Sequence, residues 1–410
     1  MKKTLVILII FINSYCVLAQ SQEIDQEKIE EDFNEIVSNL EKYYIYFSEK
    51  NIDLNCIKEY YQSQIKHIKN ESETVLFFEY LLDEFYDNHL TLGTTTKSSY
   101  RLFAPIYTTI KDGRPFIANV WQTQINKLDK NIIGAEITAF NGVSFNNAIE
   151  NFPTHCNDKN DEETREWIAN KILAGRYNEP RLLTLKLSNN KEVEFDLDTV
   201  ILKNNEDLLS SKTVDGIGVI RINNSLGNDD LVADFDKTLE KLSSTKGLII
   251  DLRNTIFGGD SYEARGIMSR FITEPKPYQR HILTEKPMNN PEVERNYLEY
   301  VSPRLETYTK PVVILVGRWT GSMGEGLAIG FEGMERAEIV GSEMRRLAGE
   351  VFDVNFKNQR FGYKLMTTKL FHVNGTIRED YIPTNYVKQT TNERDEILGK
   401  GIELINTLNN

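Results

Sequence analysis

This sequence of 410 residues has only three cysteines, fewer basic than acidic residues, and no run of the roughly 18 to 20 apolar residues that a membrane helix needs. The 48 Lys and Arg against 61 Asp and Glu give a net charge of −13, which disfavours binding to nucleic acid or to anionic lipid. The composition, 40% hydrophobic and 27% charged, excludes collagenous, coiled-coil and mostly disordered chains. We expect two to four domains, at about 100 to 200 residues each.

The first 19 residues have the pattern of a secretory signal peptide. Lys2 and Lys3 precede an apolar stretch at residues 5–12, and Val17-Leu18-Ala19 offers a cleavage site before Gln20. Its removal leaves 391 residues and, because the two lysines go with it, a net charge of −15. We therefore expect an exported protein, periplasmic or extracellular, without an integral membrane segment in its mature form.

The rest of the sequence divides into three regions by the spacing of its apolar residues. Over residues 20–92 this spacing is helical, with a third helix at about 74–86, and we predict an N-terminal helical domain. Residues 93–205 contain short β-like runs separated by Gly, Asn and Lys, which predict a β-rich domain. In residues 206–410 wholly apolar strands alternate with amphipathic helices, the pattern of βαβ units and of a parallel sheet covered on both faces.

Two cysteines remain after the leader, and they fall in different regions. Cys56 lies in the helical region and Cys156 in the β-rich region. We therefore expect packed apolar cores, and not a disulfide framework, to hold the fold together.

Two predicted strands end in segments that suit catalysis, since sites in parallel sheets lie at the carboxyl ends of strands. GLIIDL is followed by RNTIFGG, whose Gly258 and Gly259 allow close approach of the backbone and offer N–H donors. PVVILVG is followed by RWTGSMGEG, which puts Ser322 at the first turn of a helix, where the helix dipole favours a developing oxyanion. Ser322 and Glu325 also form the capping-box pattern S-x-x-E, so a purely structural role stays open.

Taken together, DLRN…GG, TGSMGEG, DNHL (residues 87–90) and IPTNYV (residues 382–387) resemble peptidase family S41, the tail-specific and tricorn-type processing proteases. The resemblance covers most of the chain. It implies an α/β fold with a crotonase-like or ClpP-like core and a parallel sheet, an N-terminal helical domain (20–92) and a PDZ-like domain (93–205) before the core (206–410). The implied activity is that of a serine peptidase that cleaves peptide or unfolded-protein substrates through an acyl-enzyme.

Carried over to this sequence, the resemblance makes Ser322 the nucleophile. The backbone N–H of Met323, together with that of Gly258 or Gly259, becomes the oxyanion hole. One branch of the family uses a lysine as the base, and that position falls on Leu347 here. A Ser-Lys dyad is therefore not expected, and the resemblance is closer to the tricorn-like branch, which uses a histidine.

The histidine of that branch corresponds to His89 in DNHL, near the end of the helical region. An imidazole can take the proton of a serine hydroxyl and return it to the leaving amine, so His89 is the expected general base. The acid of the family falls on Glu379 in TIREDYIPT, for which a solvated surface carboxylate is the alternative. Asn88 and Asp87 are the expected orienting residues.

Two other functions remain open at this point. The first is a catalytically inactive peptide- or ligand-binding protein on the same fold. The second is a crotonase-like acyl-CoA enzyme, against which export and the acidic balance argue. No HExxH, paired Cys-x-x-Cys, GxGxxG or P-loop lysine motif is present, so we expect no metal and no cofactor. The sequence leaves the oligomeric state and the cleavage preference open.

Overall fold

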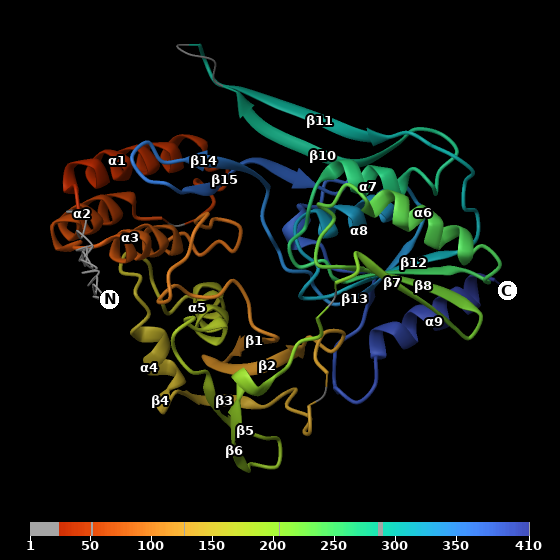
Figure 1. Cartoon of the computed structure of the whole chain (residues 1–410), viewed down its shortest axis with the longest axis horizontal. Helices are drawn as coiled ribbons and strands as arrows, with labels where there is room; N and C mark the ends of the chain where they lie inside the picture. The colour runs from red at the N-terminus through yellow and green to blue at the C-terminus, as the bar shows by residue number, and fades with distance from the viewer. Residues whose placement is uncertain (1–23, 51, 127, 205, 286–289, 410) are drawn as a thin grey trace, which may run out of the picture.

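The computed structural model describes residues 24–409 except 51, 127, 205 and 286–289 (Figure 1). The expected leader, residues 1–19, lies outside the described residues. The described residues fold into a mixed α/β structure with three separate sheets.

Three α-helices and one short 3-10 helix follow the start of the described chain. They are α1 (Gln26–Tyr43), α2 (Leu54–Gln64), the 3-10 helix η1 (Ile65–His67) and α3 (Glu71–Asp83). Each α-helix begins at a side chain that accepts a backbone N–H of the first turn, from Asp25, Asp53 and Asn70 respectively. Such caps satisfy amides that have no partner within the helix.

An antiparallel sheet of order β1-β2-β3-β5-β6, with β4 paired to β3, occupies the middle of the chain. Its elements are β1 (Ile106–Lys111), β2 (Arg114–Val120), β3 (Glu136–Phe140), β4 (Val143–Ser144), α4 (Phe145–Glu150), α5 (Glu162–Ala174), β5 (Leu182–Lys186), β6 (Glu192–Asp196) and η2 (Leu197–Thr199). Asn141 and Gly142 form the tight turn between β3 and β4, both with positive φ. The predicted order of strand, Asn-Gly turn, strand and helix is confirmed.

The last half of the chain contains the predicted parallel sheet, of order β16-β13-β12-β9-β8-β7. All neighbours pair in parallel except β7, which pairs antiparallel with β8 at one edge. The helices α6, α7 and α8 cover one face, and α9 covers the other (Figure 1). The elements are β7 (Leu209–Val214), β8 (Ile217–Asn223), α6 (Leu231–Lys241), β9 (Leu248–Asn254), α7 (Ser261–Met268), β12 (Val312–Val316), α8 (Met323–Gly333), β13 (Glu338–Gly341), η3 (Arg378–Asp380), β16 (Asn385–Tyr386) and α9 (Glu396–Leu408).

A second antiparallel sheet, of order β11-β10-β15-β14, was not predicted. It consists of β10 (Lys276–Glu285), β11 (Val293–Val301), β14 (Glu350–Asn355) and β15 (Gly362–Phe371). Tyr363 and Met366 of β15 share one apolar core with Phe33 of α1 and Phe78 of α3. In Figure 1 the red and orange N-terminal helices accordingly lie against the blue strands β14 and β15. This sheet attaches the N-terminal helices to the C-terminal half of the chain.

A disulfide joins Cys56 of α2 to Cys156, with 5.6 Å between the two Cα atoms. This single bond was not predicted, since the sequence led us to expect packed apolar cores and no disulfide framework. The two cysteines meet because the loop after α4 packs against the N-terminal helices, where the Glu84 carboxylate accepts the backbone N–H of His155 and Cys156. Such tertiary contacts have no signature in the spacing of the cysteines.

Replacing both cysteines with serine is expected to lower the free energy of unfolding by about 4 to 5 kcal/mol. The physical reason is that the bond closes a loop of 100 residues in the unfolded chain. Urea unfolding with and without a reductant measures the effect. The reductant should destabilise the wild type and leave the serine variant unchanged, whereas a wild type that is insensitive to reductant would contradict the pairing.

Candidate active site

Ser322 follows strand β12 and caps helix α8. Its N–H donates to Glu325 Oε2 at 2.8 Å, so the predicted pairing of Ser322 with Glu325 is present. The backbone of Ser322 has φ 50° and ψ −115°, a conformation that costs a residue with a side chain about 1 to 3 kcal/mol. A capping role explains the start of the helix, but it does not explain this strain.

Gly258 lies directly against Ser322. A Cβ atom placed on Gly258 would be 2.3 Å from Ser322 Cβ, 2.9 Å from Ser322 Oγ and 2.9 Å from the backbone nitrogen of Met323. A Cβ on Gly259 would instead meet Leu226, at 2.4 Å from its carbonyl carbon. The glycine that adjoins the serine is therefore Gly258, and only a residue without a side chain fits there.

The N–H groups near Ser322 differ in their partners. The N–H of Gly258 donates to the Thr255 carbonyl at 3.1 Å. Among the described residues, no hydrogen-bond acceptor is found for the N–H of Met323, at the first turn of α8. The N–H of Met323 is thus without an acceptor in the described part of the chain, and that of Gly258 is bonded within its own loop.

Glu325 is fully buried and connects Ser322 to the segment that follows β13. Its carboxylate accepts the N–H of Ser322 through Oε2, the N–H of Leu347 through Oε2 at 3.1 Å, and the N–H of Arg346 through Oε1 at 2.8 Å. Burial raises the pKa of this carboxyl group to about 7, against the opposing charge of Arg378 and these hydrogen bonds. The sequence indicated the capping role of Glu325, but not its bonds to residues 346 and 347.

His89 lies in the short loop after α3, and its side chain is 8% exposed. Its Nδ1 is 2.8 Å from the carbonyl oxygen of Ala348. A carbonyl can only accept, so Nδ1 carries the proton and Nε2 is left with its lone pair. Burial lowers the pKa of His89 from 6.5 to about 4, so the imidazole is neutral near pH 7.

The loop that carries His89 is held by Asp87. Asp87 Oδ1 accepts the backbone N–H of His89 at 2.8 Å, and Asp87 Oδ2 accepts the hydroxyl of Tyr44 at 2.8 Å. Asp87 therefore orients the backbone of His89, while the ring is oriented by Ala348. Asn88 between them is exposed.

The segment 347–349 joins the two halves of the site. The guanidinium of Arg378, which is 2% exposed, donates to the carbonyls of Leu347 at 2.7 Å and Gly349 at 3.0 Å. The same segment bonds His89 through Ala348 and Glu325 through Leu347. Ser322 and His89, 233 positions apart in the sequence, are therefore positioned by one short stretch of backbone.

Glu379 lies beside Arg378 in the same region. Burial raises the pKa of the Glu379 carboxyl group, and the neighbouring Tyr46 hydroxyl, followed by the charge of Arg378, opposes this. Glu379 and Tyr46 thus lie close together, although within the described chain neither the Glu379 carboxylate nor the Tyr46 hydroxyl makes a hydrogen bond of good geometry. Burial, and then the charge of the Glu379 carboxylate, raise the pKa of Tyr46. The charge of Asp87 raises the pKa of both Tyr46 and Glu379. Glu379 and Asp87 therefore lie in the same neighbourhood.

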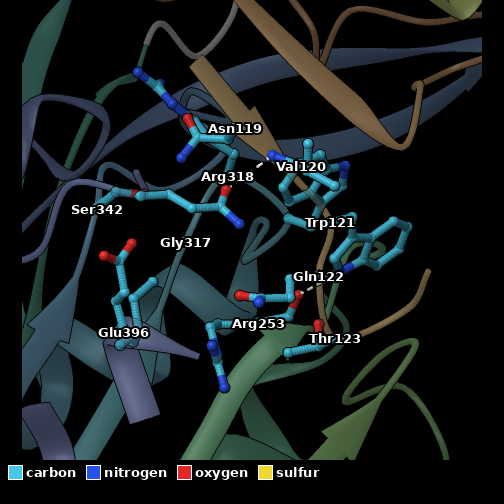
Figure 2. A pocket seen from close by; sticks show the side chains of 13 residues that line it. Asn119, Val120, Trp121, Gln122, Thr123, Arg253, Gly317, Arg318, Ser342 and Glu396 are labelled. Carbon is cyan, nitrogen blue, oxygen red and sulfur yellow. Dashed lines mark hydrogen bonds between the residues drawn. The ribbon is translucent and has the colours of Figure 1, made fainter. Parts of the chain in front are cut away.

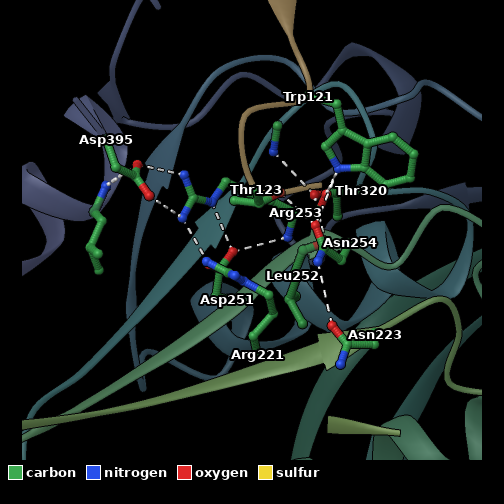
Figure 3. A network of polar contacts seen from close by, with 12 residues as sticks. Trp121, Thr123, Arg221, Asn223, Asp251, Leu252, Arg253, Asn254, Thr320 and Asp395 are labelled. Atoms are coloured by element: carbon green, nitrogen blue, oxygen red, sulfur yellow. Dashed lines mark hydrogen bonds and ion pairs between the residues drawn. The ribbon is translucent and has the colours of Figure 1, made fainter. Parts of the chain in front are cut away.

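The end of β9, which leads into the Gly258 loop, is fixed by a polar network (Figure 3). Arg253 pairs with Asp251 at 2.8 Å and with Asp395, the cap of α9, at 2.7 Å. Trp121, just after β2, donates from Nε1 to the Arg253 carbonyl at 2.9 Å. These contacts tie the middle sheet and the C-terminal helix to the strand end from which the loop departs.

A small cavity of about 30 Å³ lies at the ends of β12 and β13, between the parallel sheet and the end of β2 (Figure 2). Its lining includes Trp121, Arg253, Arg318, Ser342 and Glu396. Neither Ser322 nor His89 lines it, so it is separate from the nucleophile.

The described part of the chain shows no group of three or more His, Cys, Asp or Glu side chains arranged to hold a metal ion. In the same residues, no helix is both long and apolar enough to cross a membrane.

Two parts of the chain match known protein families. Residues 216–386 match the model of peptidase family S41, and residues 25–83 match that of the tricorn protease C1 domain. A search of the sequences of curated proteins gives no significant match.

Several solved structures share the fold over almost the whole chain. Mature CPAF is 14% identical, with 94% of this chain and 96% of that chain covered and a TM-score of 0.63. The photosystem II D1 C-terminal processing protease is 13% identical, with 94% and 98% covered and a TM-score of 0.54. A putative peptidase from Parabacteroides merdae is 16% identical, with 92% and 96% covered and a TM-score of 0.54. The solved structures show the shared fold, and the match of residues 216–386 to peptidase family S41 makes the chain a serine-type peptidase.

Proposed function

We propose that the protein cleaves peptide bonds with Ser322 as nucleophile and His89 as general base, as in the tricorn-like branch of the family. The single observation that carries this proposal is the bond between His89 Nδ1 and the Ala348 carbonyl. This bond leaves Nε2 as the proton acceptor, on the same segment that Glu325 connects to Ser322. The match to the tricorn protease C1 domain over residues 25–83 supports this branch.

In the proposed reaction, Ser322 Oγ attacks the scissile carbonyl while His89 Nε2 takes its proton. The same nitrogen then gives the proton to the leaving amine, and an acyl-enzyme on Ser322 remains. A water molecule activated by His89 attacks the ester and releases the second product. This sequence returns both side chains to their starting protonation states.

The oxyanion is held by backbone N–H groups. Met323 N–H is the first donor, at the amino end of α8, where the helix dipole also favours negative charge. Gly258 N–H is the second donor, and it becomes available when its bond to the Thr255 carbonyl breaks. We infer that this peptide rearranges when substrate binds.

The protonated imidazole that forms during the reaction needs a nearby negative charge. Ala348 supplies only a carbonyl dipole at Nδ1. Glu379, with Asp87 beside it, is the acidic group that we assign to this role, as the family resemblance implied. Both residues belong to the neighbourhood of Tyr46, at the junction of the N-terminal helices and the C-terminal half.

We also propose export to the periplasm or the extracellular space, and a PDZ-like role for the middle sheet in binding a substrate carboxyl terminus or gating access to the site. The Cys56–Cys156 bond supports export, since disulfides persist in oxidising compartments. The Asn-Gly hairpin and the helix that follows it support the PDZ-like assignment.

An inactive binding protein on the same fold is the alternative. The observation that favours it is the bond of Gly258 N–H to Thr255, which withdraws one oxyanion donor from the site. The protein would then bind peptides without cleaving them.

The two functions separate in one assay. Purified protein is incubated with a fluorophosphonate, which reacts with activated serine hydroxyls, and hydrolysis of a denatured protein is followed before and after. A peptidase loses its activity in step with labelling. Binding of the denatured protein without cleavage and without labelling would reject the peptidase proposal.

A further inference from the structure

Two large apolar side chains lie exposed on segments that connect to the Ser322 loop. Phe257, the residue before Gly258, is 55% exposed, and Leu102 from the segment before β1 is 47% exposed. Single exposed apolar residues are common on protein surfaces. These two are unusual because the packing beneath them leads directly to the nucleophile.

Arg345 links the two exposed residues to the serine loop. Its guanidinium donates through Nη1 to the carbonyl of Ile256 at 2.8 Å and through Nη2 to the carbonyl of Leu102 at 3.0 Å. A Cβ placed on Gly321, the residue before Ser322, would be 3.3 Å from Arg345 Cδ and 2.7 Å from the Ile256 carbonyl oxygen. The backbone that carries Phe257 and Leu102 is thus fixed at one residue from the nucleophile.

The rings beneath Phe257 form a rigid support. Phe257 and Phe103 meet edge to face at 5.9 Å between centroids, and Phe103 meets Trp121 at 5.7 Å. Trp121 in turn stacks on Trp319 at 5.3 Å. Trp121, Trp319 and Ile256 form one apolar cluster against which Phe103 packs, and Phe257 contacts this cluster through Phe103.

We propose that Phe257 and Leu102, supported by Arg345, form a subsite that binds an apolar side chain of the peptide substrate next to the bond that Ser322 attacks. The inference rests on the proposed peptidase function and adds a substrate class to it. The occupant is a substrate side chain, because Phe257 precedes the glycine that contacts Ser322, so a residue bound on its ring lies within one or two positions of the reacting carbonyl. An apolar side chain on this surface removes both aromatic and aliphatic area from water.

Arg345 acts as a positioning residue in this subsite. Its Nη1 and Nη2 donate to the carbonyls of Ile256 and Leu102, and its guanidinium lies 5.7 Å from the centroid of the Phe103 ring. Burial lowers the pKa of Arg345 to about 10, and it stays charged near pH 7. Its role is to hold the backbone segments that carry Leu102 and Phe257 together, and substrate contact falls to the two apolar residues.

The test uses the full mature chain and a set of peptides that differ only at the residue on either side of the scissile bond, which is Leu, Phe, Gly, Glu or Lys. At one of these two positions the wild type should prefer Leu or Phe over Gly by roughly 10-fold to 100-fold in kcat/KM. In Phe257→Ala this preference should fall about tenfold, mostly through KM, whereas Phe257→Leu should keep most of it. Phe352→Ala, which removes a ring 51% exposed on β14, is the matched control and should change nothing.

A small fluorophosphonate separates this subsite from the catalytic groups. Its rate of reaction with Ser322 should be the same in Phe257→Ala and in the wild type. Three results would overturn the subsite and leave the peptidase function standing. They are an unchanged preference in Phe257→Ala, an equal loss of kcat/KM for all peptides, and a change in sedimentation that shows the surface to be a contact between two copies. A wild type that neither reacts with the probe nor cleaves any peptide would overturn both.

Discussion

Replacing Ser322 with alanine is expected to abolish peptide hydrolysis, with a fall in kcat of about 10⁶-fold. No other group at the site can form the acyl-enzyme, and the remaining N–H donors can only bind the carbonyl. The variant should fold as the wild type does, because alanine keeps the bond of the Ser322 backbone N–H to Glu325 and the Ser322 carbonyl that accepts the N–H groups of Glu325 and Gly326. Hydrolysis of the denatured protein, with circular dichroism as the check on folding, measures both parts.

The matched control for this variant is Ser211→Ala, which removes an exposed hydroxyl on β7. It should leave activity and stability unchanged. Activity that persists in Ser322→Ala at more than a hundredth of the wild-type rate would show that another residue carries the reaction.

Replacing His89 with glutamine is expected to lower kcat by about 10⁴-fold or more, because the serine hydroxyl then has no base. The pH profile of kcat/KM for the wild type provides a sharper readout. Burial gives His89 a pKa of about 4 in the free protein, so the acidic limb should fall near pH 4 and not near 6.5, the value of an exposed histidine. His281→Gln, which alters another buried histidine, should keep this limb.

The same group makes stability depend on pH. Since the pKa of His89 is lower in the folded than in the unfolded chain, its contribution is complete above about pH 6.5 and is lost as the pH falls toward 4. The wild type should lose about 2 kcal/mol from this group between pH 7 and pH 5. His89→Gln should lack that part of the loss. Urea unfolding at the two pH values gives the comparison, and equal losses in both proteins would show that His89 is not buried as a neutral imidazole.

The parallel sheet could be predicted because its strands are apolar on both faces. Strands β9 and β12 are buried at every position, and continuous apolar runs between amphipathic helices have few other interpretations. Strand β11 was missed because VERNYLEYV buries only Val301, and such a mixed pattern does not distinguish an edge strand from a loop. The sheet that joins the N-terminal helices to the rest of the chain therefore had no local signal.

Part of the candidate site could also be predicted from the sequence, and part could not. Ser322, Met323 and Gly258 follow strand ends, where the sequence pattern is informative. The partner of His89 is a backbone carbonyl, that of Ala348, and a carbonyl leaves no trace in the identity of a residue. Arg378, which binds the same segment, was not predicted either, because its role depends on contacts between residues about 30 positions apart.

The dependence of Ser322 on a histidine from the N-terminal helices is the central claim. The most direct measurement is the rate at which a fluorophosphonate labels the wild type and His89→Gln, with the modified residue located by mass spectrometry. The account predicts a single adduct on Ser322 in the wild type, and labelling at least 100-fold slower in the variant. An adduct on a different residue, or an equal rate of labelling in the two proteins, would contradict it.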